Sequence, residues 1–307
     1  MHEPMDVLHQ FPVRKTKAQK ETFRAAVRQY VSELGYGVQE EEGSFGCRNL
    51  VIGDPQKAKY LVTAHYDTCA RMLIPNLITP CNLFWFLLYQ ILLVMLLMIP
   101  MLLGAVLGGA MQTPLIFWLG YVLFWINLAM LLVGPANPSN ANDNTSGVVT
   151  LLEIARTMPE NQRDKVCFVL FDLEEAGLIG SAAYRKTHRK ETDRQIVLNL
   201  DCVGDGDELL MFLTKRMKKD RRKLASLYKA CGYFGKKSLL VWEKGFSIYP
   251  SDQMQFPWGV GICALRKSRF GLYMGRIHTP RDTVLEPTNV NILRAALTTF
   301  ICCDEVN

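Results

Sequence analysis

The sequence lacks charged residues over one long internal stretch. Between Met72 and Asn142 there is no Asp, Glu, Lys or Arg, so all 35 basic and 29 acidic residues lie in the flanking parts of the chain. A composition of 49% hydrophobic and 21% charged residues excludes global disorder. The flanks are typical of a soluble protein, whereas the middle is not, and a uniform water-soluble globule fits this distribution poorly.

Three further absences restrict the class of protein. The nine cysteines include no CxxC pair, and several lie in apolar runs, as Cys167 does, which favours reduced thiols in a reducing compartment. The first residues contain no apolar run of the kind found in a cleavable signal peptide. No serine lies in a Gly-x-Ser-x-Gly elbow, so the sequence gives no support for a serine hydrolase.

The positive charge of the chain is mild. The formal net charge is +6, with one dense basic cluster at Lys215–Lys223. A solvated helix face is the favoured interpretation of this cluster, and contact with an anionic membrane surface is the first alternative. No nucleic-acid-binding motif accompanies it, so no nucleic-acid partner is expected.

Two apolar runs fill the charge-free stretch. Leu83–Leu103 and Leu115–Val133 each approach the roughly 20 apolar residues that cross a bilayer as a helix. Gly104–Pro114, with Gly108-Gly109, supplies turn residues between them. We therefore predict a transmembrane helical hairpin. The alternative is a buried core hairpin, or an apolar lid, in a soluble enzyme.

The flanking sequence alternates between helices and short apolar strands. Helical spacing predicts helices at 18–34, 146–158, 178–189, 221–231 and 289–303, and apolar runs predict strands at 48–52, 60–64, 165–171, 196–200, 209–213 and 260–265. This alternation predicts an α/β fold with a mixed, mostly parallel central sheet flanked by helices. Ligands of such sheets bind at the carboxyl ends of the strands.

Polar side chains stand at these strand ends and at helix starts. They include His65 and Asp67, Asp143, the pair Glu174-Glu175, Asp201 and His278. Imidazoles and carboxylates are a donor mixture that Zn²⁺ accepts. Each residue alone has an ordinary explanation: Asp143 could cap a helix, and the Glu pair could be exposed charge.

Taken together, the stretches resemble the zinc exopeptidase family of co-catalytic di-zinc aminopeptidases, metallopeptidase family 28. The resemblance is carried by His-Tyr-Asp-Thr at 65–68, Asn-Asp-Asn-Thr-Ser-Gly at 142–147 and Phe-Asp-Leu-Glu-Glu-Ala-Gly-Leu-Ile-Gly-Ser at 171–181. It continues with Asn-Leu-Asp at 199–201, Ser-Asp at 251–252 and Ile-His-Thr-Pro-Arg-Asp-Thr at 277–283. All five ligand types occur in the family's order.

The resemblance implies a role for each of these residues. Asp143 would bridge two zinc ions per chain, of which one would take His65 and Asp201 and the other Glu175 and His278. Glu174 would be the general base, and Asp67 would fix the tautomer of His65. Tyr249 lies close to where some members place a tyrosine that stabilises the oxyanion, although a packed core tyrosine explains it equally well.

The sequence departs from the family pattern at several places. His65 and Asp143 are 78 residues apart, much farther than in typical members, and the excess is the predicted hairpin. Gln253 stands where many members carry His, which leaves the nature of the substrate side of the pocket undecided.

Cys69 and Cys202 flank proposed ligands. Either could bind metal, but packing as small apolar side chains is the favoured interpretation.

The resemblance implies a membrane-anchored zinc aminopeptidase that hydrolyses the N-terminal residue of peptides. Two alternatives remain: a glutaminyl-cyclase-like enzyme on the same scaffold, and an inactive peptidase-like membrane receptor or scaffold. We expect residues 1–80 and 135–307 to form the two parts of the peptidase domain, with the hairpin at 81–134 tying it to the lipid bilayer. Both parts should lie on the cytoplasmic side. The sequence does not reveal the oligomeric state.

Overall fold

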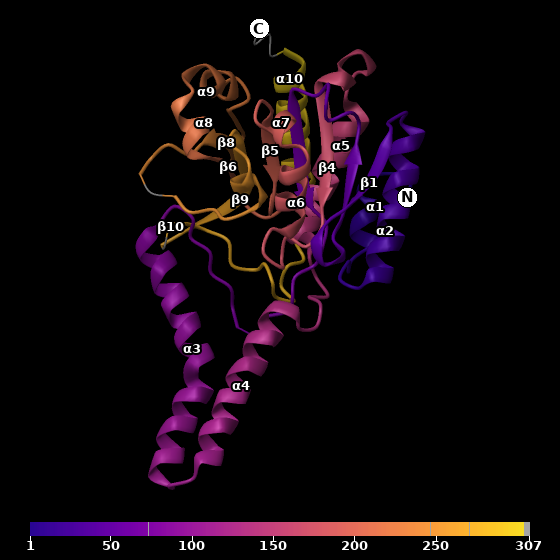
Figure 1. The fold of residues 1–307 in the computed structure, drawn as a ribbon. Coiled ribbons are helices and arrows are strands. Elements are labelled where there is room, and N and C mark those ends of the chain that lie inside the picture. Colours follow the sequence, from indigo (N-terminus) through magenta and orange to yellow (C-terminus); the bar gives the residue numbers. More distant parts are fainter. Residues whose placement is uncertain (73, 246, 270, 304–307) are drawn as a thin grey trace.

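The computed structural model describes residues 1–307 except 73, 246, 270 and 304–307. Its centre is a mixed sheet with the order β1-β2-β4-β3-β5-β9-β6-β8-β7, and β10 pairs with β9 (Figure 1). The strands are β1 Val38–Glu42, β2 Arg48–Ile52, β3 Tyr60–His65, β4 Val166–Phe171, β5 Ile196–Leu200, β6 Glu208–Leu213, β7 Gly232–Phe234, β8 Lys237–Val241, β9 Gly259–Ser268 and β10 Gly271–Tyr273.

The central strands of the sheet are parallel and the antiparallel pairs lie toward its edges. β4, β3, β5 and β9 are parallel neighbours, and β6 is parallel to β8, whereas β1 with β2, β2 with β4, β9 with β6 and β7 with β8 are antiparallel. The helices are α1 Asp6–Gln10, α2 Lys17–Glu33, α3 Leu83–Ala110, α4 Pro114–Val133, α5 Gly147–Thr157, α6 Ile179–Thr187, α7 Arg189–Thr192, α8 Lys215–Lys219, α9 Arg221–Tyr228 and α10 Pro287–Cys303. The predicted α/β class with a flanked central sheet is confirmed.

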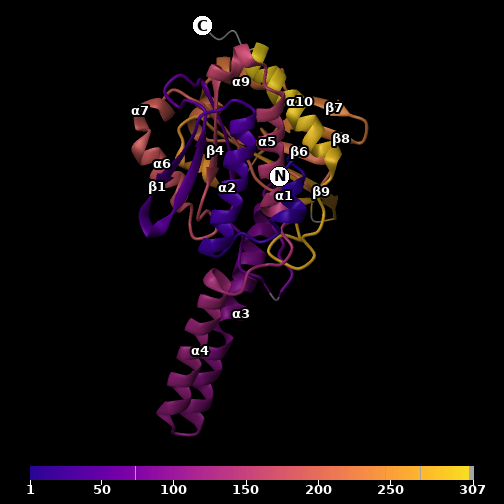
Figure 2. The same ribbon diagram turned by 90° about the vertical axis from the view of Figure 1, so that its right-hand side faces the viewer.

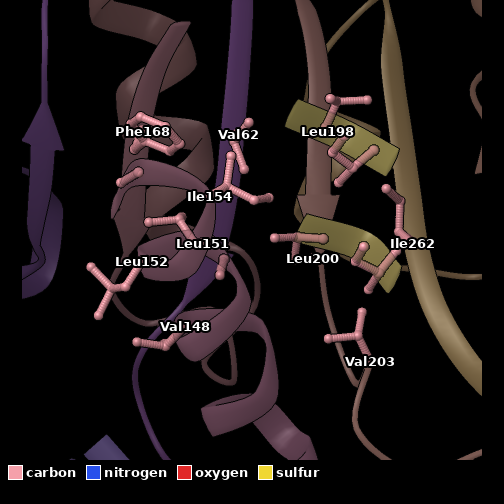
Figure 3. Packing of buried hydrophobic residues seen from close by; sticks show 14 of the residues in the cluster. Val62, Val148, Leu151, Leu152, Ile154, Phe168, Leu198, Leu200, Val203 and Ile262 are labelled. Atoms are coloured by element: carbon pink, nitrogen blue, oxygen red, sulfur yellow. The ribbon is translucent and has the colours of Figure 1, made fainter. Parts of the chain in front are cut away.

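Side chains of the buried strands alternate between two cores. In β4, Phe168 and Leu170 join the larger core, which α2, α5 and α10 cover, whereas Cys167 and Val169 join a smaller core with Tyr184 of α6. Figure 3 shows Val148, Leu151, Leu152 and Ile154 of α5 packed against Val62, Phe168 and Leu198 of the strands. Because both faces of these strands are buried, their sequences are continuously apolar rather than alternating.

The charge-free stretch forms two long helices that leave the α/β domain as a hairpin (Figures 1 and 2). α3 has 28 residues and α4 has 20, and both are long and apolar enough to cross a membrane. At 1.5 Å per residue they are about 42 Å and about 30 Å long. Within these two fully described helices the buried residues are Gly104, Gly108 and Gly120, so the apolar side chains are partly or fully exposed. The alternative interpretation, a hairpin buried in the core of the domain, is therefore wrong.

Glycines allow the two helices of the hairpin to approach closely. A Cβ at Gly120 would lie 2.4 Å from the carbonyl oxygen of Pro100 and 2.9 Å from Cα of Gly104. Small residues at such positions are typical of packed membrane helices. The turn predicted at Gly104–Pro114 is too long, since α3 continues to Ala110 and Gly108 packs against Phe117. The glycines are interface residues here and do not break the helix.

The sequence patterns missed several edge elements. β1 has the polar sequence Val-Gln-Glu-Glu-Glu and pairs with β2. Its Glu40 forms ion pairs with Arg24, Arg28 and Arg48.

The basic cluster at 215–223 lies in α8 and the first turn of α9, at the end of the domain opposite the hairpin (Figures 1 and 2). This position does not favour contact with the bilayer that the hairpin would enter.

Candidate metal centre

The predicted site residues meet at one edge of the sheet. β3 ends at His65, which lies beside Phe171, the last residue of the parallel strand β4. Glu174 and Glu175 follow β4, and Asp201 follows β5. The carboxyl ends of parallel neighbours share an edge, so the topology alone brings these side chains together.

Asp143 lies between the two histidines. Its Oδ1 is 3.2 Å from Nε2 of His65, and its Oδ2 is 2.9 Å from Nε2 of His278. Nε2 of His65 also lies 3.6 Å from Asp201 Oδ1, and Nε2 of His278 lies 3.5 Å from Glu175 Oε2. The donors therefore form two sets of three, His65–Asp143–Asp201 and His278–Asp143–Glu175, which share the carboxylate of Asp143.

A close packing of helix and strand ends places Asp143. It belongs to the segment Ala141–Ser146, just before α5. At Gly147, the first residue of α5, a Cβ would lie 2.3 Å from the carbonyl oxygen of Leu200 and 2.4 Å from Asn144 Oδ1. Only glycine permits this approach, which sets the start of α5 against the end of β5.

The donor atoms are buried without enough hydrogen-bond partners. Among the described residues, Glu175 Oε1 and Asp201 Oδ1 are buried atoms that make no hydrogen bond. Such atoms are costly unless something satisfies them. Donor atoms within 4.8 Å of one another form the groups His65–Asp143–Asp201 and Cys69–Asp143–Glu175–His278, in which the Cys69 sulfur joins imidazole nitrogens and carboxylate oxygens. This chemistry fits divalent zinc.

The electrostatics of the cluster reflect crowded carboxylates. Burial raises the pKa of Glu175 to about 8 despite the nearby His278, and burial likewise raises the pKa of Glu174 well above its usual value. Burial opposes ionisation of Asp143, but hydrogen bonds from His278 and His65 hold its pKa below the ordinary range. Burial alone would lower the pKa of His278. The neighbouring carboxylates of Glu175 and Asp143 outweigh this effect, so the pKa is raised to about 9. The concentration of negative charge suits a cation.

Asp67 connects His65 to the loop that carries the glutamates. Asp67 Oδ1 is 3.4 Å from Nδ1 of His65, and the carboxylate accepts the backbone N–H groups of Glu174 at 3.1 Å and Glu175 at 3.3 Å. One buried carboxylate therefore positions a histidine and two glutamates at once.

The remaining predicted residues lie at the edge of the site or behind it. The hydroxyl of Tyr249 donates to the backbone oxygen of Asp201 at 2.9 Å, and its ring stacks on Phe212. Gln253 is buried, donates to the backbone oxygen of Tyr249 at 2.7 Å and accepts from Asn199 at 3.2 Å. Gln253 is therefore a supporting residue. Cys202 is buried in the core cluster around Tyr249.

Sequence reasoning missed two supporting groups. Asp282 accepts the backbone N–H groups of Asn142 at 2.7 Å and Asp143 at 3.0 Å, and it falls inside a motif that already stood out. Arg14 is fully buried and donates to the backbone oxygens of Phe11 at 2.6 Å and Tyr66 at 2.5 Å. Burial lowers its pKa to about 10. Nothing in the local sequence around Arg14 signals this burial.

The backbone around the site adopts uncommon conformations. Leu173, Cys202 and His278 have positive φ values of 54°, 56° and 61°. Each is a predicted ligand or lies within two residues of one. Residues other than glycine rarely adopt this conformation, and those that do gather at functional sites.

A cavity of about 480 Å³ opens onto the donor cluster. His65, Asp143, Glu174, Glu175, Asp201 and His278 form its acidic end, and the remaining lining residues are mostly apolar. Two of the lining residues, Phe86 and Gln90, belong to α3 of the hairpin. The cavity therefore has one wall from outside the α/β domain.

Comparison with known proteins gives one family. Peptidase family M28 matches residues 129–300, which contain Asp143, Glu174, Glu175, Asp201 and His278, while His65 and Asp67 lie outside the matched range. Aminopeptidase YwaD of Bacillus subtilis is 42% identical over 73 residues, which are 23% of this chain and 16% of that protein. The match thus spans about a sixth of that relative's length.

Solved structures share the fold at low sequence identity. A Zn-dependent exopeptidase from Parabacteroides distasonis aligns with a TM-score of 0.62 and 15% identity over 96% of this chain and 94% of that chain. A glutaminyl cyclase from Porphyromonas gingivalis aligns with a TM-score of 0.60 and 16% identity over 95% and 93%. The LapA aminopeptidase of Legionella pneumophila aligns with a TM-score of 0.58 and 16% identity over 98% and 69%.

Proposed function

Because the chain belongs to peptidase family M28, we propose that it is a zinc-dependent aminopeptidase that removes the N-terminal residue from peptides. The observation that carries this proposal is the position of Asp143, whose two carboxylate oxygens face two different histidines. His65 and Asp201 would hold one zinc ion and Glu175 and His278 would hold a second, and Asp143 would be a ligand of both.

The residues of the chain divide the chemistry between them. When bound, a pair of zinc ions lowers the pKa of water and polarises the scissile carbonyl. Glu174 takes the proton of the attacking water and passes it to the leaving amine. Asp67 acts through others, because it orients His65 and holds the backbone of the loop that carries Glu174. The acidic end of the cavity suits the positively charged α-amino group of a peptide.

The metal count tests this arrangement. Purified wild-type protein is expected to contain two zinc ions per chain by elemental analysis. His278→Ala should retain about one, because it leaves His65, Asp143 and Asp201 intact as a three-donor site. His9→Ala is the matched control: His9 is exposed in α1, and this variant should keep both ions. A wild-type content of one ion, unchanged by His278→Ala, would contradict the two-zinc site.

The structural likeness to glutaminyl cyclases supports one other candidate. A glutaminyl-cyclase-like enzyme would release ammonia from a peptide with N-terminal glutamine, whereas an aminopeptidase releases the first amino acid. The shared carboxylate of Asp143 between two donor sets favours the aminopeptidase. Parallel assays of leucine p-nitroanilide hydrolysis and of ammonia release from a glutaminyl peptide separate the two. Absence of both activities in zinc-loaded protein would favour an inactive receptor or scaffold.

We further propose that α3 and α4 anchor the enzyme in a bilayer and that the catalytic domain is cytoplasmic. Support comes from the apolar side chains of both helices, which are partly or fully exposed. The connecting residues 111–113 are uncharged, whereas Arg71 precedes the hairpin. All nine cysteines are free, as expected in a reducing compartment. His65 and Asp143 flank the hairpin, so both of its ends must lie on one side for the donors to meet.

Membrane extraction and protease protection test the anchoring and its orientation. The protein is expected to stay in the pellet after carbonate extraction, because two apolar helices hold it in the bilayer. In intact cells the catalytic domain should resist external protease until the membrane is permeabilised. Release by carbonate would support an apolar lid on a soluble enzyme, and digestion in intact cells would reverse the orientation.

A further inference from the structure

The first turns of α3 are part of the catalytic cavity. Phe86 and Gln90 are four residues apart, so they lie on one face of the helix, and both line the cavity together with His65 and Glu174. Phe84 lies two positions before Phe86, points elsewhere and is 67% exposed. The same helix thus presents one phenylalanine to the cavity and another to its surroundings.

Contacts with the domain hold this end of α3 in place. The side chain of Asn82 accepts the backbone N–H of Trp85 at 3.3 Å and caps the helix. The hydroxyl of Tyr89 donates to the backbone oxygen of Pro75 at 3.0 Å. Ile78, in the segment that leads into α3, exchanges backbone hydrogen bonds of 2.9 Å with Met274, so the wall that Phe86 and Gln90 form is attached to the α/β domain through this segment.

The lengths of the two helices place this wall at the membrane surface. Gly104 of α3 packs against Gly120 of α4 in an antiparallel pair, so the last residue of α4, Val133, is level with about Ile91. Residues 83–90 of α3 extend beyond α4 toward the domain (Figure 1). If α4 crosses the bilayer with its 20 residues, these two turns lie at the interface between lipid and water.

The chemistry of the cavity wall indicates what it binds. Beyond the donor cluster the lining is largely apolar and includes Ile78, Leu178, Met274 and Ile277. Gln90 is the one residue of α3 with a side-chain amide, and it lines the cavity. An amide that faces an apolar cavity suits the main chain of a bound peptide.

We propose that the first two turns of α3 form part of the substrate-binding site, and that the substrate is a peptide with an apolar N-terminal segment held at the bilayer surface. This inference rests on the proposed aminopeptidase function. Phe86 contacts the apolar side chains of the peptide, and the Gln90 amide hydrogen-bonds to its main chain. The membrane helix therefore selects the substrate in addition to anchoring the enzyme.

A pair of matched variants tests the role of the helix. The zinc-loaded enzyme in phosphatidylcholine vesicles is assayed with a peptide that begins Leu-Phe and ends in palmitoyl-lysine, and with the same peptide without palmitate. The wild type should cleave the palmitoylated peptide with a kcat/KM at least tenfold higher. Phe86→Ala should reduce kcat/KM for that peptide about tenfold, mainly through KM, whereas Phe84→Ala should leave it unchanged. Equal effects of the two variants, or no preference for the palmitoylated peptide, would overturn the inference.

A second variant and a binding assay keep the inference separate from the proposed function. If Phe86→Ala does not fold, Gln90→Leu should raise KM about three- to tenfold, as expected for a lost hydrogen bond, and an unchanged KM counts against the role of α3. If the wild type cleaves neither peptide, the aminopeptidase function fails. Binding of the fluorescently labelled peptide to vesicle-bound protein then decides: weaker binding to Phe86→Ala than to Phe84→Ala supports the role of α3, and equal binding contradicts it.

Discussion

Glu174→Gln is expected to lower kcat by about 10²–10⁴-fold, the usual contribution of a general base. The amide keeps the shape of the side chain but does not accept the proton of the attacking water. Zinc content should stay at the wild-type level, because the five proposed ligands are untouched. The measurement is kcat on leucine p-nitroanilide, together with elemental analysis of the same sample.

Glu160→Gln is the matched control for this experiment. Glu160 lies in the turn before β4 and its side chain is 88% exposed, so the same chemical change there should leave kcat unaltered. If Glu174→Gln retained near wild-type turnover, Glu174 would have no part in the proton transfer. If it lost zinc along with activity, Glu174 would be a ligand instead.

Asp143→Ala is expected to remove both zinc ions and to reduce activity below about one thousandth of wild type. Asp143 is shared by the two donor sets, so its loss leaves His65 with Asp201 and His278 with Glu175. Two protein donors are fewer than the three that catalytic zinc sites usually have. Loss of a single group that stabilises the developing oxyanion already costs about 10²–10³ in kcat.

The graded series of variants makes this prediction specific. Zinc content should fall from two in the wild type to one in His278→Ala and to none in Asp143→Ala. The fold should survive, since the backbone N–H of residue 143 still donates to Asp282 and the apolar core is unchanged. Circular dichroism of the metal-free proteins checks this. One ion retained by Asp143→Ala would mean that Asp143 belongs to a single site.

The central strands and the strand-end residues could be predicted because local pattern and topology agree there. Continuous apolar runs such as Val166–Phe171 identify strands that are buried on both faces. β1 could not be found in this way, because its glutamates are those of an edge strand and its partner β2 and the arginines around Glu40 stabilise it. Gly104 and Gly108 predict a turn locally, but helix packing, a tertiary effect, decides their conformation.

The site shows the same division between local and long-range information. The ordered motifs identified the candidate ligands, whereas the distances between them follow from the strand order. Arg14 and the cavity wall at Phe86 carry no local signal, since each acquires its surroundings from segments far away in the sequence. The assignment of roles to the ligands remains a prediction that the experiments above address.

The strand order also dictates when the N-terminal strands can join the rest of the sheet during biosynthesis. β4 lies between β2 and β3, yet Phe171 follows His65 by 106 residues. At roughly 5–20 residues per second, the ribosome needs on the order of 5–20 s to supply the strand that joins β2 to β3. During that interval both hairpin helices are completed. The edges of β2 and β3 that face β4 therefore stay open until both hairpin helices have been synthesised, and the proposed ligands Glu175, Asp201 and His278 are made later still.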